Sequence, residues 1–166
     1  MCYGASMSPT ESPDMLIIPR DDPHPSMIIE VKLSLGGLEN IEHQIKRYMI
    51  RSGCPTALLV SPTLLRVYRD TFTSYDEGSI LMVGEFPMAE VFGGWLASTN
   101  QAAHPGLGLQ FEAAVRGWLE GLTEASSVAS LPPALRDAVE VHVLPVLERG
   151  EVRVSGPRVL WKRTGS

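Results

Sequence analysis

Cysteine is scarce in this sequence: Cys2 and Cys54 are the only two among 166 residues. They form no CxxC spacing and no cluster with histidine, which argues against a disulfide framework and against a zinc site. No apolar run approaches the roughly 18 residues of a membrane span, and Met1 to Pro13 lack the basic and apolar regions of a signal peptide. We therefore expect a cytoplasmic protein with no membrane association.

A surplus of basic residues is also missing, because 14 Lys and Arg stand against 19 Asp and Glu, a net charge of −5. This balance argues against a broad electrostatic footprint on nucleic acid, but it does not exclude an enzyme whose carboxylates hold metal ions. The chain up to Asp70 is close to neutral, and residues 71–166 carry most of the acidity. With 44% hydrophobic and 20% charged residues, the composition is that of one globular domain.

Apolar patterning in the first half predicts an α/β arrangement. Residues 1–12 are rich in Ser, Thr, Pro and Gly and read as a flexible lead-in. Short apolar runs bounded by turn residues predict strands at 15–19, 27–33, 56–60 and 64–69, the first two antiparallel to each other. An apolar stripe at helical spacing predicts a helix over 38–52 that ends at Gly53, and its members are Leu38, Ile41, Ile45 and Met49.

The second half is predicted to be mainly helical. We expect a short strand at 79–83, helices at 88–96 and 109–122, and loops at 98–108 and 123–130. Another helix begins at Pro132 and is expected to kink or end at Pro145. Strands are expected at 151–154 and 159–162. Residues 98–166 would thus be a mainly helical extension packed on a core formed by 13–97.

Two carboxylates and an ammonium are predicted to meet on adjacent strands. Asp14 heads the first expected strand and Glu30 lies on the second, so both can converge on one cation. Alternation with a period of two puts Glu30 and Lys32 on the same face. Mg²⁺ prefers oxygen ligands, and the carbonyl of Val31 could add one. Such an ion polarises a phosphoryl group and activates water, while a lysine stabilises the developing charge, so the set suits phosphodiester hydrolysis.

The same residues resemble a known family. Pro13-Asp14 followed by Glu30-Val31-Lys32 matches the signature of the PD-(D/E)xK nuclease superfamily, and Gln44 and Tyr48 look like the QxxxY motif of its RecB-like subset. The stretch 13–70, about a third of the chain, also resembles in element order the N-terminal nuclease domain of type I restriction enzyme R subunits.

The resemblance implies a restriction-endonuclease-like core and Mg²⁺-dependent hydrolysis of DNA, with Mn²⁺ as a substitute ion. Asp14 and Glu30 would bind the metal together with the Val31 carbonyl, and Lys32 would be catalytic. Gln44 and Tyr48 would support the site or touch the DNA backbone. The side chains available for phosphates are those of Lys46, Arg47 and Arg51.

The sequence departs from the family at its start. The family core begins with a helix and a strand ahead of the Asp strand, and only twelve residues precede Pro13. Two explanations stay open: the chain is truncated, or these elements come from elsewhere. One hypothesis is a permuted helix–strand unit, with the helix from Pro132, the strand from Glu151, and Glu140 as a candidate acid.

Other functions remain open at this stage. Asp14 could simply begin a strand, and Glu30 with Lys32 could be the exposed face of an edge strand. A catalytically inactive nuclease-fold module that binds nucleic acid or a protein partner is the main alternative, and an unrelated α/β interaction protein is the third. For the nuclease, target choice would require a homodimer or a partner subunit.

Overall fold

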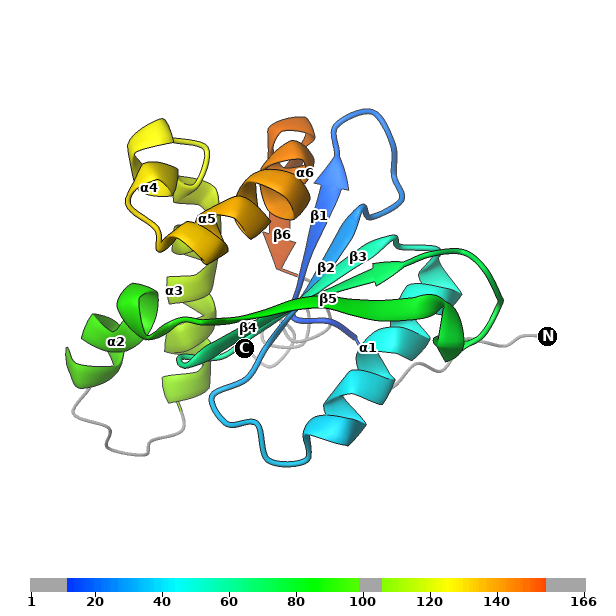
Figure 1. The fold of residues 1–166 in the computed structure, drawn as a ribbon, viewed down its shortest axis with the longest axis horizontal. Coiled ribbons are helices and arrows are strands. Elements are labelled where there is room, and N and C mark those ends of the chain that lie inside the picture. Colours follow the sequence, from blue (N-terminus) through cyan, green and yellow to red (C-terminus); the bar gives the residue numbers. More distant parts are fainter. Residues whose placement is uncertain (1–11, 99–105, 155–166) are drawn as a thin grey trace, which may run out of the picture.

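The computed structural model describes residues 12–98 and 106–154, which form one six-stranded mixed sheet with helices on both faces (Figure 1). The α/β class predicted from the sequence is confirmed. The expected lead-in, apart from Ser12, and the strand expected at 159–162 lie outside the described residues. The strands are β1 (Met15–Pro19), β2 (Met27–Val31), β3 (Thr56–Val60), β4 (Leu64–Asp70), β5 (Ile80–Pro87) and β6 (Gly150–Val154).

The strand order is β5-β4-β3-β2-β1-β6. The β1–β2 pair is antiparallel, as predicted, and β2 runs parallel to β3 because helix α1 (Leu38–Ser52) crosses over between them. Strands β3, β4 and β5 form an antiparallel meander. Strand β6, from the far end of the chain, pairs antiparallel with the outer side of β1.

Among the helices that the structure describes, α1 alone covers one face of the sheet. Its inward stripe is buried at Ile41, Ile45 and Met49, as the helical spacing predicts. The helix ends at Gly53, which adopts the left-handed conformation (φ 70°). Figure 1 shows α1 on one side of the sheet and the later helices on the other. Glu30 and Lys32, which were expected to share one face of the sheet, lie on this face.

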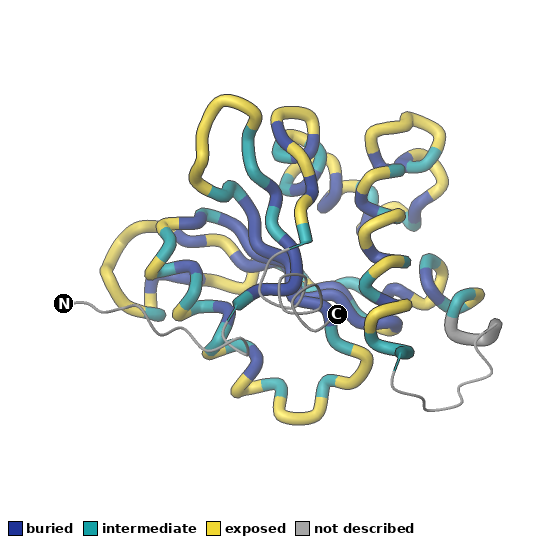
Figure 2. The backbone as a smooth tube through the Cα atoms, turned by 180° about the vertical axis from the view of Figure 1, so that it is seen from behind, coloured by how far each residue is buried: buried dark blue, intermediate teal, exposed yellow. Residues whose placement is uncertain are grey.

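The other face is covered by the remaining helices, whose apolar side chains meet the strands in the larger core. Phe111, Val115 and Leu119 of α3 are fully buried there. Figure 2 shows buried backbone running through the centre of the sheet, with exposed positions along the outer turns of the helices. The helices on this face are α2 (Ala89–Ser98), α3 (Leu107–Gly121), α4 (Ala125–Ala129), α5 (Pro133–Ala138) and α6 (Leu144–Arg149).

One expectation about local structure was wrong, and another is narrowed to one of its two alternatives. The loop expected at 123–130 contains α4, a short helix whose buried Val128 anchors it in the larger core. The helix from Pro132 was expected to kink or end at Pro145, and it does not end there. Because proline has no N–H to bond to the preceding turn, the helix widens over η4 (Val139–Val143), where the Leu144 N–H donates to the Val139 carbonyl, and then continues as α6.

The strand boundaries also differ from the expectation. Strand β2 ends at Val31 rather than Leu33, and β5 extends to Pro87, well past the expected end at Val83. A short 3₁₀ turn, η3 (Glu77–Ser79), precedes β5. None of the helices within 12–98 and 106–154 combines the length and the apolar character that crossing a bilayer requires.

Candidate functional site

Asp14 and Glu30 lie side by side on the face of the sheet that α1 covers. Asp14 is one residue before Met15, which pairs with Ile29, so the register sets it opposite Glu30. The Asp14 N–H donates to Glu30 Oε1 (3.3 Å), and the Val31 N–H donates to Asp14 Oδ2 (2.8 Å). Both side chains are buried. The strand pairing therefore brings the two predicted carboxylates together.

Lys32 completes the predicted set on the same face. Its Nζ lies 3.3 Å from Glu30 Oε2, and its backbone N–H donates to the Val60 carbonyl on β3. The Lys32 side chain is about one-third exposed, whereas the Glu30 side chain is almost fully buried. Lys32 thus reaches from the solvent edge toward the inner carboxylate.

The electrostatics of the pair centre on Glu30. Burial, followed by the nearby charge of Asp14, raises the pKa of Glu30 from 4.5 to about 7. Lys32 and the Asp14 N–H act in the opposite direction, but they do not cancel the increase. Near neutral pH, a cation placed between the two carboxylates would relieve this repulsion.

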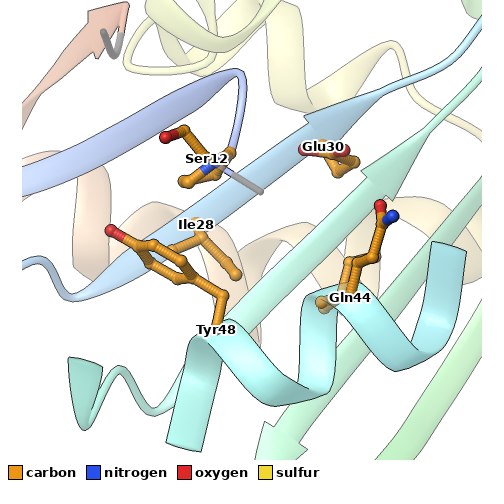
Figure 3. Close-up of a pocket in the computed structure, with 7 residues that line it drawn as sticks. Ser12, Ile28, Glu30, Gln44 and Tyr48 are labelled. Carbon is orange, nitrogen blue, oxygen red and sulfur yellow. The ribbon is translucent and has the colours of Figure 1, made fainter. Parts of the chain in front are cut away.

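Gln44 and Tyr48 of α1 face the site from the side of the sheet that α1 covers, as Figure 3 shows. With Ile45 they line a small pocket whose other walls are Ser12 and Pro13 before β1, and Ile28 and Glu30 on β2. In Figure 3, Gln44 rises from α1 toward Glu30, and the Tyr48 ring lies under Ser12. The pocket has a volume of about 10 Å³, which is room for one water molecule.

The basic side chains of α1 are not equally placed. Lys46 is two residues from both Gln44 and Tyr48, and residues at that spacing do not face each other on a helix. It therefore lies on the opposite flank of α1, away from the pocket. Arg47 is exposed on the solvent side of the helix. The structure thus leaves Lys46 outside the site for which it was proposed.

Glu140 is also separated from the carboxylate pair. It is exposed on η4, which packs on the α3 side of the sheet, whereas Glu30 faces α1. Its neighbour His142 lies 3.4 Å from Arg69 Nη1. The candidate acid of the permuted unit therefore does not reach the site, although β6 itself lies next to β1 with Val154 opposite Met15.

A polar network beside the site was missed by the sequence reasoning. Glu42 Oε2 accepts hydrogen bonds from Tyr68 Oη and Arg66 Nη1, both at 2.6 Å, and Arg66 Nε donates to Glu85 Oε1 at 2.8 Å. Burial and the bond to Glu42 raise the pKa of Tyr68. Alternation along β4, which places Arg66 and Tyr68 on one face, was the available signal.

The donor set suits a hard divalent cation only in part. Within the residues that the structure describes, no cluster of three or more His, Cys, Asp or Glu could hold a metal. Asp14 and Glu30 supply two carboxylates, and Mg²⁺ sites commonly use one or two carboxylates together with water and substrate oxygens. Comparison with protein-family models, curated proteins and solved structures finds no match.

Proposed function

We propose that this chain is a metal-dependent phosphodiesterase acting on DNA, with a restriction-endonuclease-like core of the PD-(D/E)xK type. The observation that carries the proposal is the adjacency of Asp14 and Glu30, buried and linked by the Asp14 N–H at 3.3 Å. Two acids are rarely buried together without a partner, because burial and like charge both oppose ionisation. A divalent cation is the partner that such a pair suits.

In this proposal each residue of the site has a distinct task. Asp14 and Glu30, with the Val31 carbonyl, would hold Mg²⁺ or Mn²⁺. When bound, the ion would polarise the phosphoryl group and lower the pKa of the attacking water. Lys32, one-third exposed beside Glu30, is placed to stabilise charge on the phosphate. Gln44 and Tyr48 line, together with Glu30, a pocket with room for about one water molecule.

The order of strands supports the same family. An antiparallel pair carrying the acids is followed by a helix and a parallel strand, here β1, β2, α1 and β3. Strand β6 occupies the position beside β1 that the family's first strand would take. We therefore propose that the preceding helix, α5 to α6, and β6 are the permuted helix–strand unit, without Glu140 as a site acid.

A second candidate is a catalytically inactive nuclease fold that binds nucleic acid or a protein partner. It is favoured by the contacts within the site: Lys32 already pairs with Glu30, and the Val31 N–H already bonds to Asp14. Two carboxylates that already have partners within the chain do not need a metal ion to be stable. The net charge of −5 also favours it.

A nuclease assay separates the two candidates. The wild-type chain would be incubated with single- and double-stranded DNA and with RNA, in Mg²⁺, in Mn²⁺ and in EDTA. We expect metal-dependent cleavage that Asp14→Asn and Lys32→Ala abolish, and that Asp22→Asn, an exposed loop carboxylate, leaves unchanged. Cleavage that survives both site substitutions would refute the assignment, and binding without cleavage under any condition would favour the inactive module.

A further inference from the structure

A pocket lies at the end of the sheet away from Glu30. The Asp70 N–H, at the end of β4, donates to the carbonyl of Pro55, which directly precedes β3. Glu30 instead pairs with Leu59, near the other end of β3. The walls of the pocket are the C-terminal end of α1 and the loop between β4 and η3, and its volume of about 500 Å³ is that of a ligand site. The proposed reaction uses none of these residues.

Asp70 supplies a buried carboxylate to the wall of this pocket. The residue is only 8% exposed. Its Oδ1 accepts hydrogen bonds from the Phe72 N–H at 2.8 Å and from the Ser79 hydroxyl at 2.7 Å. Both hydrogen bonds that the side chain accepts from the described residues use this one oxygen, so Oδ2 remains for a ligand. A carboxylate in such surroundings favours a partner that brings positive charge and N–H donors.

Two aromatic rings stand beside this carboxylate. Phe72 and Tyr75 line the pocket and are 63% and 99% exposed. Phe72 has a φ of +57°, a left-handed conformation that glycine or asparagine would adopt at lower cost. Strain of this kind is typical of functional positions, and here it holds a large ring toward solvent. The faces of such rings attract cations.

The charge of the loop decides which sign of ligand it suits. Segment 70–79 contains three carboxylates, those of Asp70, Asp76 and Glu77, and it has no lysine or arginine. Glu77 Oε1 lies 2.6 Å from His43 Nδ1, which ties the end of this loop to α1. A nucleic acid strand carries a phosphate at every nucleotide and would be repelled here. The two rings are therefore better suited to a cation than to a nucleobase.

We propose that the pocket formed by Asp70, Phe72 and Tyr75 binds an arginine side chain of a protein partner. A guanidinium is planar and weakly hydrated, so it stacks on aromatic rings more readily than an ammonium does. Its N–H groups would donate to Asp70 Oδ2 in a charge-assisted hydrogen bond. Tyr75, almost fully exposed, would contact the partner chain on either side of the arginine. The proposal goes beyond phosphodiester hydrolysis and does not rest on it.

The test is fluorescence anisotropy of a short labelled peptide of glycine and arginine, titrated with the full chain without metal. The comparison peptide carries citrulline, which has the shape of arginine without its charge. We expect the wild type to bind the arginine peptide about tenfold more tightly than the citrulline peptide. If the wild type does not bind the arginine peptide, or binds both peptides equally, the proposal is overturned.

Substitutions in the loop separate this pocket from general attraction between a basic peptide and a chain of net charge −5. Phe72→Asn and Tyr75→Ser remove a ring without changing the charge, and each should weaken binding of the arginine peptide about tenfold. Asp70→Asn keeps the Oδ1 acceptor and should weaken binding as well. The matched controls are Leu109→Ser on α3 and Glu124→Gln, both at exposed positions, and both should bind as the wild type does.

Urea unfolding shows whether each variant is folded. Phe72→Asn should unfold at no lower urea concentration than the wild type, because asparagine tolerates a positive φ. If it does not fold, Tyr75→Ser decides the question, since that side chain is almost fully exposed. Unchanged affinity in Tyr75→Ser would overturn the proposal. So would a single-stranded oligonucleotide that binds the wild type and is weakened by Tyr75→Ser, because the loop would then bind nucleic acid.

Discussion

Replacing Glu30 by glutamine should stabilise the protein, and more so at higher pH. The pKa of Glu30 is raised from 4.5 to about 7 by burial and by Asp14. The folded state therefore holds this proton more tightly than the unfolded chain does. The stability that Glu30 contributes is present below pH 4.5 and is lost as the pH rises through about 7. Between pH 5 and pH 8, linkage puts this loss at about 2–3 kcal/mol.

Urea unfolding of the wild type and Glu30→Gln at pH 5, 6.5 and 8 would measure the effect. The difference between the two unfolding free energies should grow by about 2–3 kcal/mol over this range. Glu151→Gln, an exposed carboxyl on β6, serves as the control and should show no such trend. If the difference in unfolding free energy between wild type and Glu30→Gln does not change with pH, the argument that burial and Asp14 oppose the ionisation of Glu30 is refuted.

Mg²⁺ extends the same experiment to the proposed ion. A cation that binds the folded state alone stabilises it, by about 2.7 kcal/mol at one hundred times its dissociation constant. We expect this gain at pH 8 for the wild type and its loss in Glu30→Gln. An equal gain in both proteins would place the ion elsewhere.

Three further substitutions test the surroundings by urea unfolding. Tyr68→Phe removes the 2.6 Å hydrogen bond to Glu42 and should lower the free energy of unfolding by about 1 kcal/mol. An unchanged free energy of unfolding would mean that this network does not hold α1 on β4. Gly53→Ala should lower the free energy of unfolding by about 1–2 kcal/mol, because φ is 70° there. The added Cβ would meet nothing within 4 Å, so the loss comes from the backbone conformation alone. Leu119→Ala, at a fully buried position, should cost about 2–5 kcal/mol, and a smaller loss would indicate a loosely packed α3.

The parts of the fold that were predictable are set by short-range patterns. The α1 stripe, its glycine stop and the alternation of Glu30 with its neighbours all follow from helix and strand periods. These gave the bounds of α1 and the face on which Glu30 and Lys32 lie. Adjacency of Asp14 and Glu30 followed as well, because a short turn joins β1 to β2 and makes them antiparallel.

The remaining features depend on contacts that no local pattern encodes. Helix α4 exists because one side chain, Val128, is buried in the larger core, and its flanking Thr, Glu and Ser residues read as loop. The widened turn before Pro145 makes up for the backbone hydrogen bond that proline cannot donate. From the sequence alone, the same proline is equally consistent with the end of a helix. Glu42, Arg66 and Glu85 meet because three separate elements are brought together, so their pairing was not predictable.

The position of Asp14 illustrates how a local motif depends on a distant segment. Strand β1 shares five register pairs with β6 and only three with β2. At the start of β6, a Cβ on Gly150 would lie 2.5 Å from the Ile18 carbonyl oxygen, so glycine permits this close approach. The hairpin alone would leave one side of β1 without a partner, and a lone hairpin is marginally stable in water. The carboxylate at the head of β1 is therefore held in place by the far end of the chain, although its motif is read entirely from the first fifty residues.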